Sequence, residues 1–474
     1  MTITTPFLAL AQARHKLFEA TASWVRPLVI LCVLGLSFLL PLAASAERIL
    51  LLCALFVGLT GVLLFIQWPS LGLPVLVITG FLVPSPELPG HINVAVLVVA
   101  LLIGLWLLEK LILRGRTQPI VSRTTRPVIA FILVTLLSFI VGQLPWFYLA
   151  QHAPVEAQLG QVAIFVFSGA IFLMVAQQVQ DIRWLERLVW VFLAVGALFM
   201  AGWLIGPIGS ITSQLFQLPA TSNSMFWTWL IILAFSQAVY NQRLSLRWRA
   251  VLVFLVAVTM YIAFVKNYDW KSGYFPAIVG MLAIIGVRSW RLGLVICLLS
   301  IAPLLYLSSQ AAASDDYSVS TREDAWKIVL DMSKVDPVLG FGPANYYWYT
   351  PLFSIRGWHV RFNSHNQYVD IIAQTGLLGF GAFLWFAFEV GWLGWRLRDR
   401  VPPGFAQAYV YGALGGLVGM LVSGMLVDWF LPFVYNIGFG GFRSSILAWV
   451  FLGGLVSIEQ MTRRQAATQT LPPS

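Results

Sequence analysis

Charged side chains are scarce in this chain. Asp, Glu, Lys and Arg make up 10% of its 474 residues, whereas 59% are hydrophobic and the mean hydropathy is +0.83. Soluble domains carry about 25% charged residues, so this composition excludes a water-soluble globular protein. Apolar runs of roughly 17–25 residues, which are typical of transmembrane helices, recur along most of the sequence.

Cysteine is rarer still, with three residues in the whole chain. Cys32, Cys53 and Cys297 all lie within apolar runs, which argues against a disulfide framework or a zinc site. We interpret them as small hydrophobic side chains. The sequence also shows no internal repeat and no low-complexity tract. It therefore lacks the repeated halves that many membrane transporters contain.

The apolar runs predict an all-α polytopic membrane protein with about 12–14 transmembrane helices. The predicted spans are residues 27–44, 48–66, 71–84, 92–108, 127–142, 160–176, 186–205, 224–240, 250–266, 273–287, 292–308, 368–395, 405–427 and 441–458. Residues 44–46 resemble a signal-peptide cleavage site, but further spans follow at once, so we expect the first helix to be retained. We also expect residues 1–23 to form a short interfacial helix and the polar tail after Glu459 to be disordered.

Positive charge is distributed unevenly among the segments that join these spans. With the N-terminus on the cytoplasmic side, all but nine of the 29 Lys and Arg residues fall on that same side. An excess of Lys and Arg is typical of cytoplasmic loops, so the net charge of +10 mostly reflects topology rather than affinity for nucleic acid. Both termini are therefore predicted to be cytoplasmic. The nine exceptions are Arg48, Lys266, Lys271, Arg322, Lys327, Lys334, Arg356, Arg361 and Arg443.

One polar segment, residues 309–364, interrupts the series of spans and is followed by His365 and Asn366. We divide the chain accordingly into an N-terminal transmembrane bundle (1–308), an external catalytic loop (309–367) and C-terminal transmembrane helices with a cytoplasmic tail (368–474). Seven of the nine exceptions lie between residues 266 and 361, against the topological rule. Each alone is read as a solvated charge paired with a nearby Asp or Glu, but the cluster as a whole favours an anion-binding site.

A short helix is predicted within this loop at residues 321–332. Its apolar face consists of Ala325, Ile328, Val329 and Met332. Thr321 and Asp324 resemble a capping box at the start of the helix. Arg322 then falls in the first turn, where a cation and free backbone N–H groups together make a phosphate site.

Glycines and aromatic residues follow this helix. Gly340 and Gly342 either form a plain tight turn or let the backbone approach a ligand. Tyr346 opens a run of four aromatic residues, which either stack on sugar rings or anchor the loop at the membrane interface. Cations and aromatic rings in one external loop indicate an anionic substrate that carries rings.

His365 lies where the chain re-enters the membrane. A histidine at the mouth of a span is unfavourable unless it has a partner or a function. Because imidazole titrates near neutral pH, it can act as a general base and accept a proton from an attacking hydroxyl. The alternative is a structural histidine that caps the helix or bonds a loop carbonyl. Asn366 either orients the ring or contacts the substrate.

Four groups of residues in this region, taken together, resemble the hallmark sequence of the bacterial O-antigen ligase and polymerase family. They are Arg322 with Trp326, Pro337–Gly342, Ser364–Tyr368 and Gln374–Gly379. The family pattern has an arginine ahead of a helix, a Pro-x-x-Gly-x-Gly turn, and His-Asn followed by Gly-Leu-x-Gly. The order and rough spacing agree here, and the specific part of the resemblance covers residues 320–380.

The resemblance implies an inverting glycosyltransferase of the bacterial inner membrane with a large periplasmic loop. It implies a glycan on undecaprenyl pyrophosphate as the donor, and neither a nucleotide sugar nor a metal. Family enzymes hold the pyrophosphate with arginines and use a histidine as the base, and Arg322 and His365 match those positions. A second family arginine lies in a Ser-Arg-Gly-like turn, where this chain has Lys271, with Lys266 as a competing candidate. Lysine is a point charge and lacks the bidentate fork of arginine.

The remaining site candidates are secondary. We expect further substrate contacts from Asn366, Arg361, Arg356, Gly340, Gly342 and Tyr346. The function predicted first is an O-antigen ligase, which passes the glycan to lipid A–core or to another sugar acceptor. A polymerase that adds the glycan to a second lipid-linked repeat unit is the alternative, since both use the same donor. A transporter of lipid-linked sugars is a more distant alternative, because the cations gather in one external loop rather than along the depth of the bundle.

Overall fold

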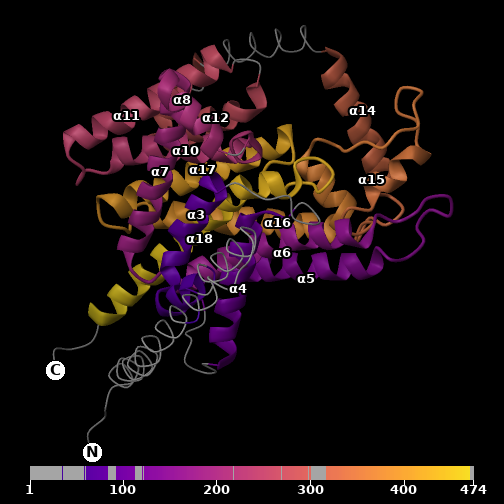
Figure 1. The fold of residues 1–474 in the computed structure, drawn as a ribbon, viewed down its shortest axis with the longest axis horizontal. Coiled ribbons are helices and arrows are strands. Elements are labelled where there is room, and N and C mark those ends of the chain that lie inside the picture. The colour runs from indigo at the N-terminus through magenta and orange to yellow at the C-terminus, as the bar shows by residue number, and fades with distance from the viewer. Residues whose placement is uncertain are drawn as a thin grey trace, which may run out of the picture. The chain divides into compact units, whose positions relative to one another are not determined.

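The computed structural model describes residues 60–83, 92–112, 122–216, 218–267, 270–296 and 316–469, together with residues 35, 58, 120, 298 and 299. Over these residues the chain is helical and contains no β-strand (Figure 1). The helices are η1 (Pro69–Leu71), α3 (Gly72–Leu82), α4 (Val94–Ile112), α5 (Thr125–Val141), α6 (Val155–Gln178), α7 (Ile182–Leu204), α8 (Gly206–Leu215), α9 (Leu218–Thr221), α10 (Ser224–Tyr240), α11 (Leu246–Tyr261), η3 (Ile262–Lys266), α12 (Lys271–Arg288), α14 (Asp316–Met332), α15 (Tyr346–Tyr349), η4 (Thr350–Leu352), α16 (Gln367–Leu397), α17 (Phe405–Leu426) and α18 (Gly438–Gln469).

Six segments in the described part of the chain are long and apolar enough to cross a membrane. They are Val155–Gln178, Ile182–Leu204, Leu246–Lys266, Gln367–Leu397, Phe405–Leu426 and Gly438–Ala467. A bent pair of helices, Thr60–Gln67 and Pro69–Leu82, makes a seventh if it is a single span, and α5 and α10 are shorter apolar helices. These findings confirm the predicted all-α polytopic membrane architecture.

The described long helices from α3 onward begin and end within a few residues of the predicted spans, except that α18 continues eleven residues past the predicted end at 458. Helix α8 was not predicted. Three predicted spans lie mostly outside the described residues: 27–44, 48–66 and 292–308. The interfacial helix predicted at 1–23 and the three cysteines lie outside the described residues too. The total of 12–14 spans therefore stays a prediction. The expected disorder after Glu459 is wrong, because α18 continues to Gln469 and an ion pair between Glu459 and Arg463 supports its next turn.

Two compact units make up the chain. Residues 1–75 and 100–119 form one, and residues 76–99 and 120–474 form the other. Within the second unit α6 packs on α18, α5 packs on α16, and α17 packs on both α10 and α12. The contact between α12 and α17 depends on small residues, because a Cβ atom added to Gly415 would lie 2.7 Å from the carbonyl oxygen of Gly280.

Polar caps start three of the long helices. Asp181 accepts the backbone N–H of Arg183 at 2.9 Å before α7, and Asn223 accepts that of Met225 at 2.8 Å before α10. Asn366 caps α16 in the same way. Such caps satisfy N–H groups that have no partner inside the helix, which matters where little water is present.

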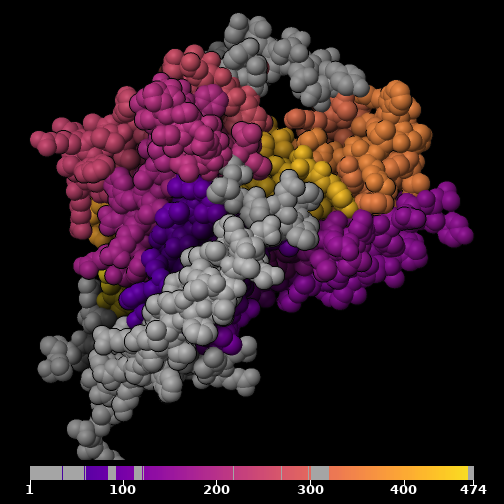
Figure 2. Space-filling view, viewed as in Figure 1, coloured from indigo at the N-terminus to yellow at the C-terminus, as the bar shows by residue number. Residues whose placement is uncertain are grey.

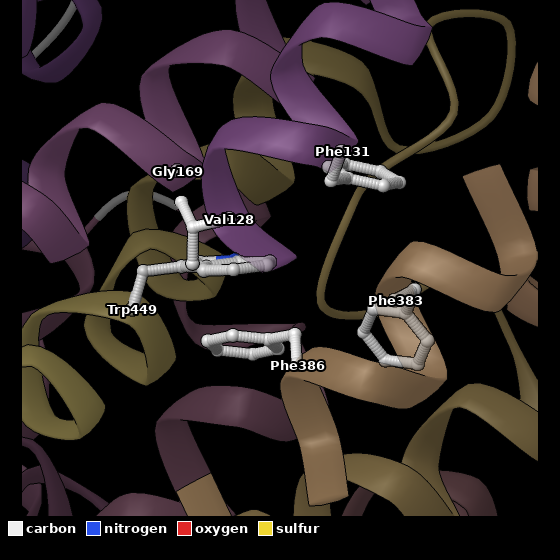
Figure 3. A pocket seen from close by; sticks show the side chains of 6 residues that line it. All are labelled: Val128, Phe131, Gly169, Phe383, Phe386 and Trp449. Carbon is white, nitrogen blue, oxygen red and sulfur yellow. The ribbon is translucent and has the colours of Figure 1, made fainter. Parts of the chain in front are cut away.

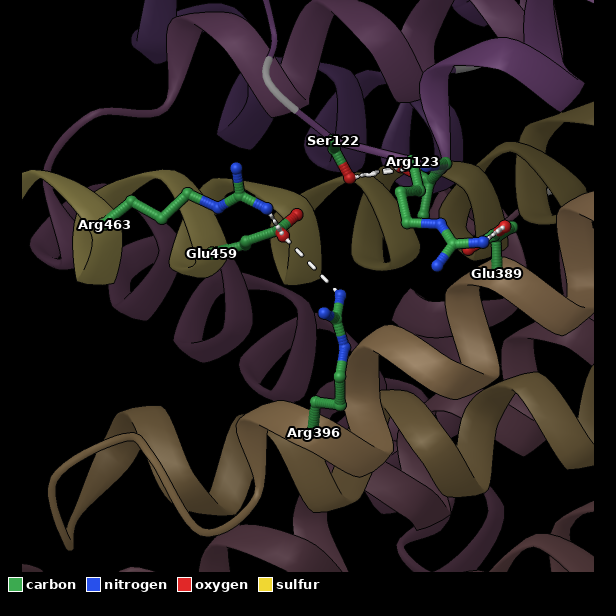
Figure 4. Close-up of polar contacts among 7 residues, drawn as sticks. Ser122, Arg123, Glu389, Arg396, Glu459 and Arg463 are labelled. Carbon is green, nitrogen blue, oxygen red and sulfur yellow. Dashed lines mark hydrogen bonds and ion pairs between the residues drawn. The ribbon is translucent and has the colours of Figure 1, made fainter.

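Helix α16 relates the two ends of the second unit. His365 and Asn366 precede its first turn, and Arg396 lies in its last turn. Helix α5 runs antiparallel to it, since Arg123 before α5 pairs with Glu389 near the end of α16 at 3.0 Å (Figure 4). We call the two ends the His365 end and the arginine end. Helices α14 and α15 lie at the His365 end, beside the loop that joins α5 to α6 (Figures 1 and 2).

A kink in α16 joins the two glycine-containing motifs of the sequence. Gly376 interrupts the helix with φ +64° and ψ −170°, so the next backbone N–H groups lack helical partners. Leu377 donates instead to the carbonyl of Pro337 at 2.8 Å, and Leu378 donates to that of Val338 at 3.2 Å. The turn after α14 therefore fills the gap that the kink opens, which explains why this fold needs both motifs.

Candidate functional site

Hydrogen bonds hold the residue before His365 from several sides. The hydroxyl of Ser364 lies 2.7 Å from a carboxylate oxygen of Asp370 and accepts the backbone N–H of Asn366 at 3.0 Å. The carbonyl of Ser364 accepts the indole N–H of Trp326 at 2.7 Å, which ties α14 to this segment. Ser364 is fully buried, so these bonds are shielded from water.

His365 itself adopts a backbone conformation that is rare for its residue type. Its φ angle is +48°, in the left-handed region that favours glycine. Such a conformation persists only where the surrounding structure imposes it. Two hydrogen bonds between the hydroxyl of Ser364 and the backbone of Asn366 supply that constraint. The chain therefore turns sharply at His365 and presents the imidazole at the mouth of α16.

The environment of His365 keeps its imidazole neutral. Burial lowers the pKa of His365 from 6.5 to about 4, and the positive charge of Arg322 contributes to the same shift. Hydrogen bonds bring Arg322 to the same place, because its guanidinium donates to the carbonyl of Leu426 and Asn366, next to His365, donates to that of Met425. The two residues that the sequence analysis placed first are therefore brought together at one site.

Arg322 lies in the second turn of α14 rather than in the first. The helix begins at Asp316, so the predicted start at Thr321 is wrong, and with it the capping box that Thr321 and Asp324 were expected to form. A phosphate site at free N–H groups beside Arg322 is not supported, because those groups lie about a turn earlier. The guanidinium donates to the carbonyl of Leu426 at 3.4 Å, and it has no carboxylate partner among the described residues.

Asn366 has a structural role in this geometry. Its side-chain oxygen accepts the backbone N–H groups of Tyr368 at 3.0 Å and Val369 at 3.3 Å, as an N-cap does. Its amide nitrogen donates to the carbonyl of Met425 at 3.4 Å. Substrate binding by Asn366 stays a prediction, whereas the cap accounts for most of its hydrogen-bonding groups.

Tyr346 is buried beneath the site rather than exposed in it. Its hydroxyl donates to Asp370 at 2.5 Å and accepts the backbone N–H of Ser364 at 3.3 Å, and its ring stacks on Phe433 with centroids 4.9 Å apart. Burial and the nearby Asp370 raise the pKa of Tyr346 well above its usual range, so the hydroxyl stays protonated. Tyr346, Asp370 and Ser364 form a buried network, which we call the Asp370 network, directly behind His365.

The two glycines of the predicted turn pack against backbone. A Cβ on Gly340 would lie 2.7 Å from the carbonyl oxygen of Ala373, and one on Gly342 would lie 2.8 Å from that of Ser138 in α5. Both have positive φ angles, +68° and +84°. These contacts describe a tight turn held between α5 and α16, and ligand binding by either glycine stays a prediction.

Arg356 and Arg361, the other arginines of the loop, already have partners. Arg356 forms an ion pair with Asp324 at 2.9 Å, which agrees with the reading of single loop charges as paired charges. The guanidinium of Arg361 lies over the ring of Trp348, 3.6 Å from its centroid. Arg361 is exposed and remains accessible to a ligand.

The two candidate lysines lie beside the start of α12. Lys266 ends η3 and is exposed, whereas Lys271 is the first residue of α12. Trp270, just before Lys271, contacts Trp429 with ring centroids 5.8 Å apart. Trp429 lies three residues after Leu426, whose carbonyl accepts the guanidinium of Arg322, so Lys271 starts its helix near the contact that Arg322 makes.

Residues 427–437 are the part of the site that the sequence analysis missed. Asp428 in this segment is buried and accepts the backbone N–H of Phe433 at 2.6 Å and the side chain of Asn436 at 2.5 Å. Gln367 and Leu431 exchange two further hydrogen bonds, which join the segment to α16. Burial raises the pKa of Asp428 above its usual range. An acidic residue at the end of an apolar run was the available signal.

A pocket deeper in the bundle is entirely apolar (Figure 3). It is lined by Val128, Phe131, Gly169, Phe383, Phe386 and Trp449. Phe386 stacks on Trp449 with centroids 5.1 Å apart, and Phe383 stacks on Phe430 at the same distance. The pocket offers no group for acid–base chemistry.

The comparisons with known proteins agree with the site geometry. A search of curated proteins found no match. A family model described as O-Antigen ligase matches residues 220–384, about a third of the chain, from α9 into α16. The matched segment contains Arg322, the turn at Gly340 and Gly342, and His365. The predicted resemblance is thus confirmed over residues 220–384, where the chain is similar to the O-antigen ligase family.

Proposed function

We propose that this protein is an inverting membrane glycosyltransferase of the O-antigen ligase type. It transfers a glycan from undecaprenyl pyrophosphate to a hydroxyl of a sugar acceptor such as lipid A–core, without a metal ion. The observation that carries the proposal is the meeting of Arg322 and His365 at one end of the bundle, where hydrogen bonds join α14 to Ser364 and bring Arg322 and Asn366 to the adjacent carbonyls of Leu426 and Met425. One group there binds a diphosphate and the other accepts a proton, which are the two tasks of this reaction.

The reaction divides between these groups as follows. His365 accepts the proton of the acceptor hydroxyl while the oxygen attacks the anomeric carbon from the face opposite the leaving group. The bond from that carbon to the pyrophosphate oxygen breaks, and its electron pair leaves with the pyrophosphate. Arg322, with Lys271 or Lys266, stabilises the charge on the departing group. No general acid is needed, because pyrophosphate is already a good leaving group.

Substrate binding prepares the base in this scheme. In the free protein the pKa of His365 is lowered to about 4, so the imidazole is neutral but only weakly basic. An anionic diphosphate on Arg322 would offset the positive charge that disfavours the imidazolium. The pKa of His365 then rises toward neutrality, where a general base works best. The base is therefore strengthened only when the donor is present.

The orientation that we propose places the His365 end in the periplasm. Arg123, Arg396, Arg398 and Arg463 all lie at the opposite end, where the basic residues of the topology prediction gather. An excess of arginine is typical of the cytoplasmic side of a bacterial inner membrane. Lipid-linked glycans and lipid A–core would then meet on the periplasmic side.

The test is transfer by the purified protein in detergent. A defined undecaprenyl pyrophosphate glycan is incubated with lipid A–core or with a second lipid-linked unit, in EDTA, and the products are identified by mass spectrometry. Glycan on lipid A–core supports the ligase, and lengthened lipid-linked glycan indicates the polymerase. Loss of transfer is expected in His365→Ala and in Arg322→Lys, whereas Arg356→Lys retains it. Full activity in His365→Ala would remove the base assignment.

A further inference from the structure

A second polar cluster lies at the arginine end of the bundle. Glu459 of α18 accepts a hydrogen bond from Arg463 at 2.6 Å, and Arg396 of α16 lies 3.9 Å from the same carboxylate oxygen (Figure 4). A cavity of about 80 Å³ opens between these two helices. It is lined by Leu393, Arg396, Leu397, Arg400, Glu459, Thr462 and Arg463. We call it the arginine cavity.

The arginine cavity carries unmatched charge and unsatisfied polar atoms. Three of its lining residues are arginines and one is a carboxylate, which leaves two positive charges uncompensated. The Nε of Arg396 and the Oε2 of Glu459 are buried and have no hydrogen-bond partner in the described part of the chain. Buried polar groups are normally paired. The lining of the cavity therefore suits a ligand that is anionic and also carries a hydrogen-bond donor.

Helix lengths place this cavity at the depth of lipid headgroups. From Gly438, where α18 begins, to Glu459 the helix rises about 32 Å at 1.5 Å per residue. From the kink at Gly376 to Arg396, α16 rises about 30 Å. The hydrocarbon core of a bilayer is about 30 Å thick. With the other ends of these helix segments at one interface, both Glu459 and Arg396 reach the opposite interface.

Aromatic residues on α16 support the same depth. Large exposed aromatic side chains follow each other at three- and four-residue intervals over its last turns. They are Trp385, Phe388, Trp392 and Trp395. This spacing puts them on one helix face, beside the face that carries Arg396 and lines the cavity. Trp392 and Trp395 lie within about 6 Å of Arg396 along the helix axis, and exposed Trp side chains are typical of the membrane–water interface.

We propose that the arginine cavity binds the headgroup of an anionic phospholipid. The phosphodiester lies against Arg400 and Arg463, and a hydroxyl of a glycerol headgroup donates to the free Oε2 of Glu459. Phosphatidylglycerol has this chemistry, whereas phosphatidylcholine lacks both the net charge and the donor. Basic pockets between transmembrane helices on the cytoplasmic side bind anionic lipids by the same attraction. The site is separate from His365 and does not depend on the proposed reaction.

The experiment titrates lipids into the full-length protein in detergent and measures bound lipid by native mass spectrometry. Phosphatidylglycerol is expected to bind saturably at one site, and phosphatidylcholine is not. In Arg400→Gln/Arg463→Gln the affinity for phosphatidylglycerol falls about 25-fold, since each arginine contributes roughly a fivefold factor. The matched control Arg183→Gln/Arg247→Gln removes the same charge from exposed positions outside the cavity and leaves the affinity unchanged.

The other outcomes overturn the proposal. Equal binding of both lipids would mean that the headgroup is not recognised. Equal loss of affinity in the two double variants would mean that overall charge attracts lipid without a site. Competition by inorganic phosphate at the same concentration as phosphatidylglycerol would identify a free-phosphate site instead of a lipid site. Thermal unfolding of each variant in detergent without lipid is measured beside the titration, and unchanged melting excludes misfolding as the cause of lost affinity.

Discussion

Replacing Arg322 with glutamine tests the electrostatic pairing on which the site depends. Arg322 and burial are the two causes that lower the pKa of His365, and burial is the larger. Glutamine is shorter than arginine, but it keeps a polar hydrogen-bonding group and carries no charge. The substitution therefore removes only the smaller cause and leaves the imidazole in its buried position.

The magnitude follows from the displacement of the pKa. A shift from 6.5 to about 4 means that protonating His365 in the folded protein costs about 3 kcal/mol more than in the unfolded chain. Because the pKa of His365 is lower in the folded protein than in the unfolded chain, the unfolded chain binds this proton first as the pH falls. The free energy of unfolding is therefore unaffected by His365 above pH 6.5 and decreases by about 3 kcal/mol as the pH falls toward 4. Arg322 accounts for less than half of the shift, so in Arg322→Gln the pKa of His365 rises but stays below its ordinary value.

The assay is modification of His365 by diethyl pyrocarbonate, which reacts with neutral imidazole. The extent of modification is read by peptide mass spectrometry at a series of pH values, with N-acetylhistidine in the same tube as the reference. In the unaltered protein the reaction reaches half its maximum near pH 4, and in Arg322→Gln at a higher pH. Arg356→Gln is the matched control, since Arg356 is paired with Asp324 and its loss leaves the midpoint unchanged. A midpoint near 6.5 in the unaltered protein, or identical midpoints in Arg322→Gln and the unaltered protein, would refute the reasoning.

Three further substitutions test the supports of the site and the opposite end of the bundle. Tyr346→Phe keeps the aromatic stack but removes a hydrogen bond to a buried carboxylate. We expect the free energy of unfolding to fall by about 2 kcal/mol in chemical denaturation, and kcat to fall in the transfer assay. Gly376→Ala places a Cβ 2.2 Å from the carbonyl oxygen of Val338 at φ +64°, so we expect it to lower the melting temperature strongly. Gly381→Ala, on the same helix with open space around it, is the control and does not lower it. Arg123→Gln leaves the buried Glu389 without its ion pair and destabilises the protein by about 1–3 kcal/mol, which thermal unfolding in detergent at neutral pH detects; an unchanged melting temperature there would show that the pair contributes nothing.

The pairing of Arg322 with His365 was accessible from the sequence because function constrains residue types there. An external arginine opposes the topological rule, and a histidine at the mouth of a span is unfavourable without a role. The spans were predicted from apolar runs alone, since a helix that crosses a membrane must bury its backbone polar groups and expose apolar side chains to lipid. Both signals are local to the chain.

The supporting residues were not predictable because their roles depend on distant contacts. Asp428 looks like an acidic residue at the end of an apolar run, and only packing shows that it organises residues 427–437. The aromatic ring of Tyr346 is of the kind that stacks on sugars, yet the side chain is buried and bonds to Asp370. The start of α14 was missed because a capping box is a local pattern, while the actual helix begins at Asp316.

The meeting of Gly340 with the kink at Gly376 shows the same limit. Each glycine alone predicts a turn or a weak helix position. Together they let two backbones approach, so that Leu377 and Leu378 find hydrogen-bond acceptors across the gap. Both motifs can be recognised in the sequence, but only the structure shows that they contact each other.

The most direct test of the central claim is a cryo-electron microscopy structure of the protein with undecaprenyl pyrophosphate bound. The account predicts a diphosphate oxygen at charge-assisted hydrogen-bond distance, about 2.7–2.9 Å, from the guanidinium of Arg322, with His365 facing the same cavity. A diphosphate bound at the arginine end, or held at the His365 end without contact to Arg322, would contradict it.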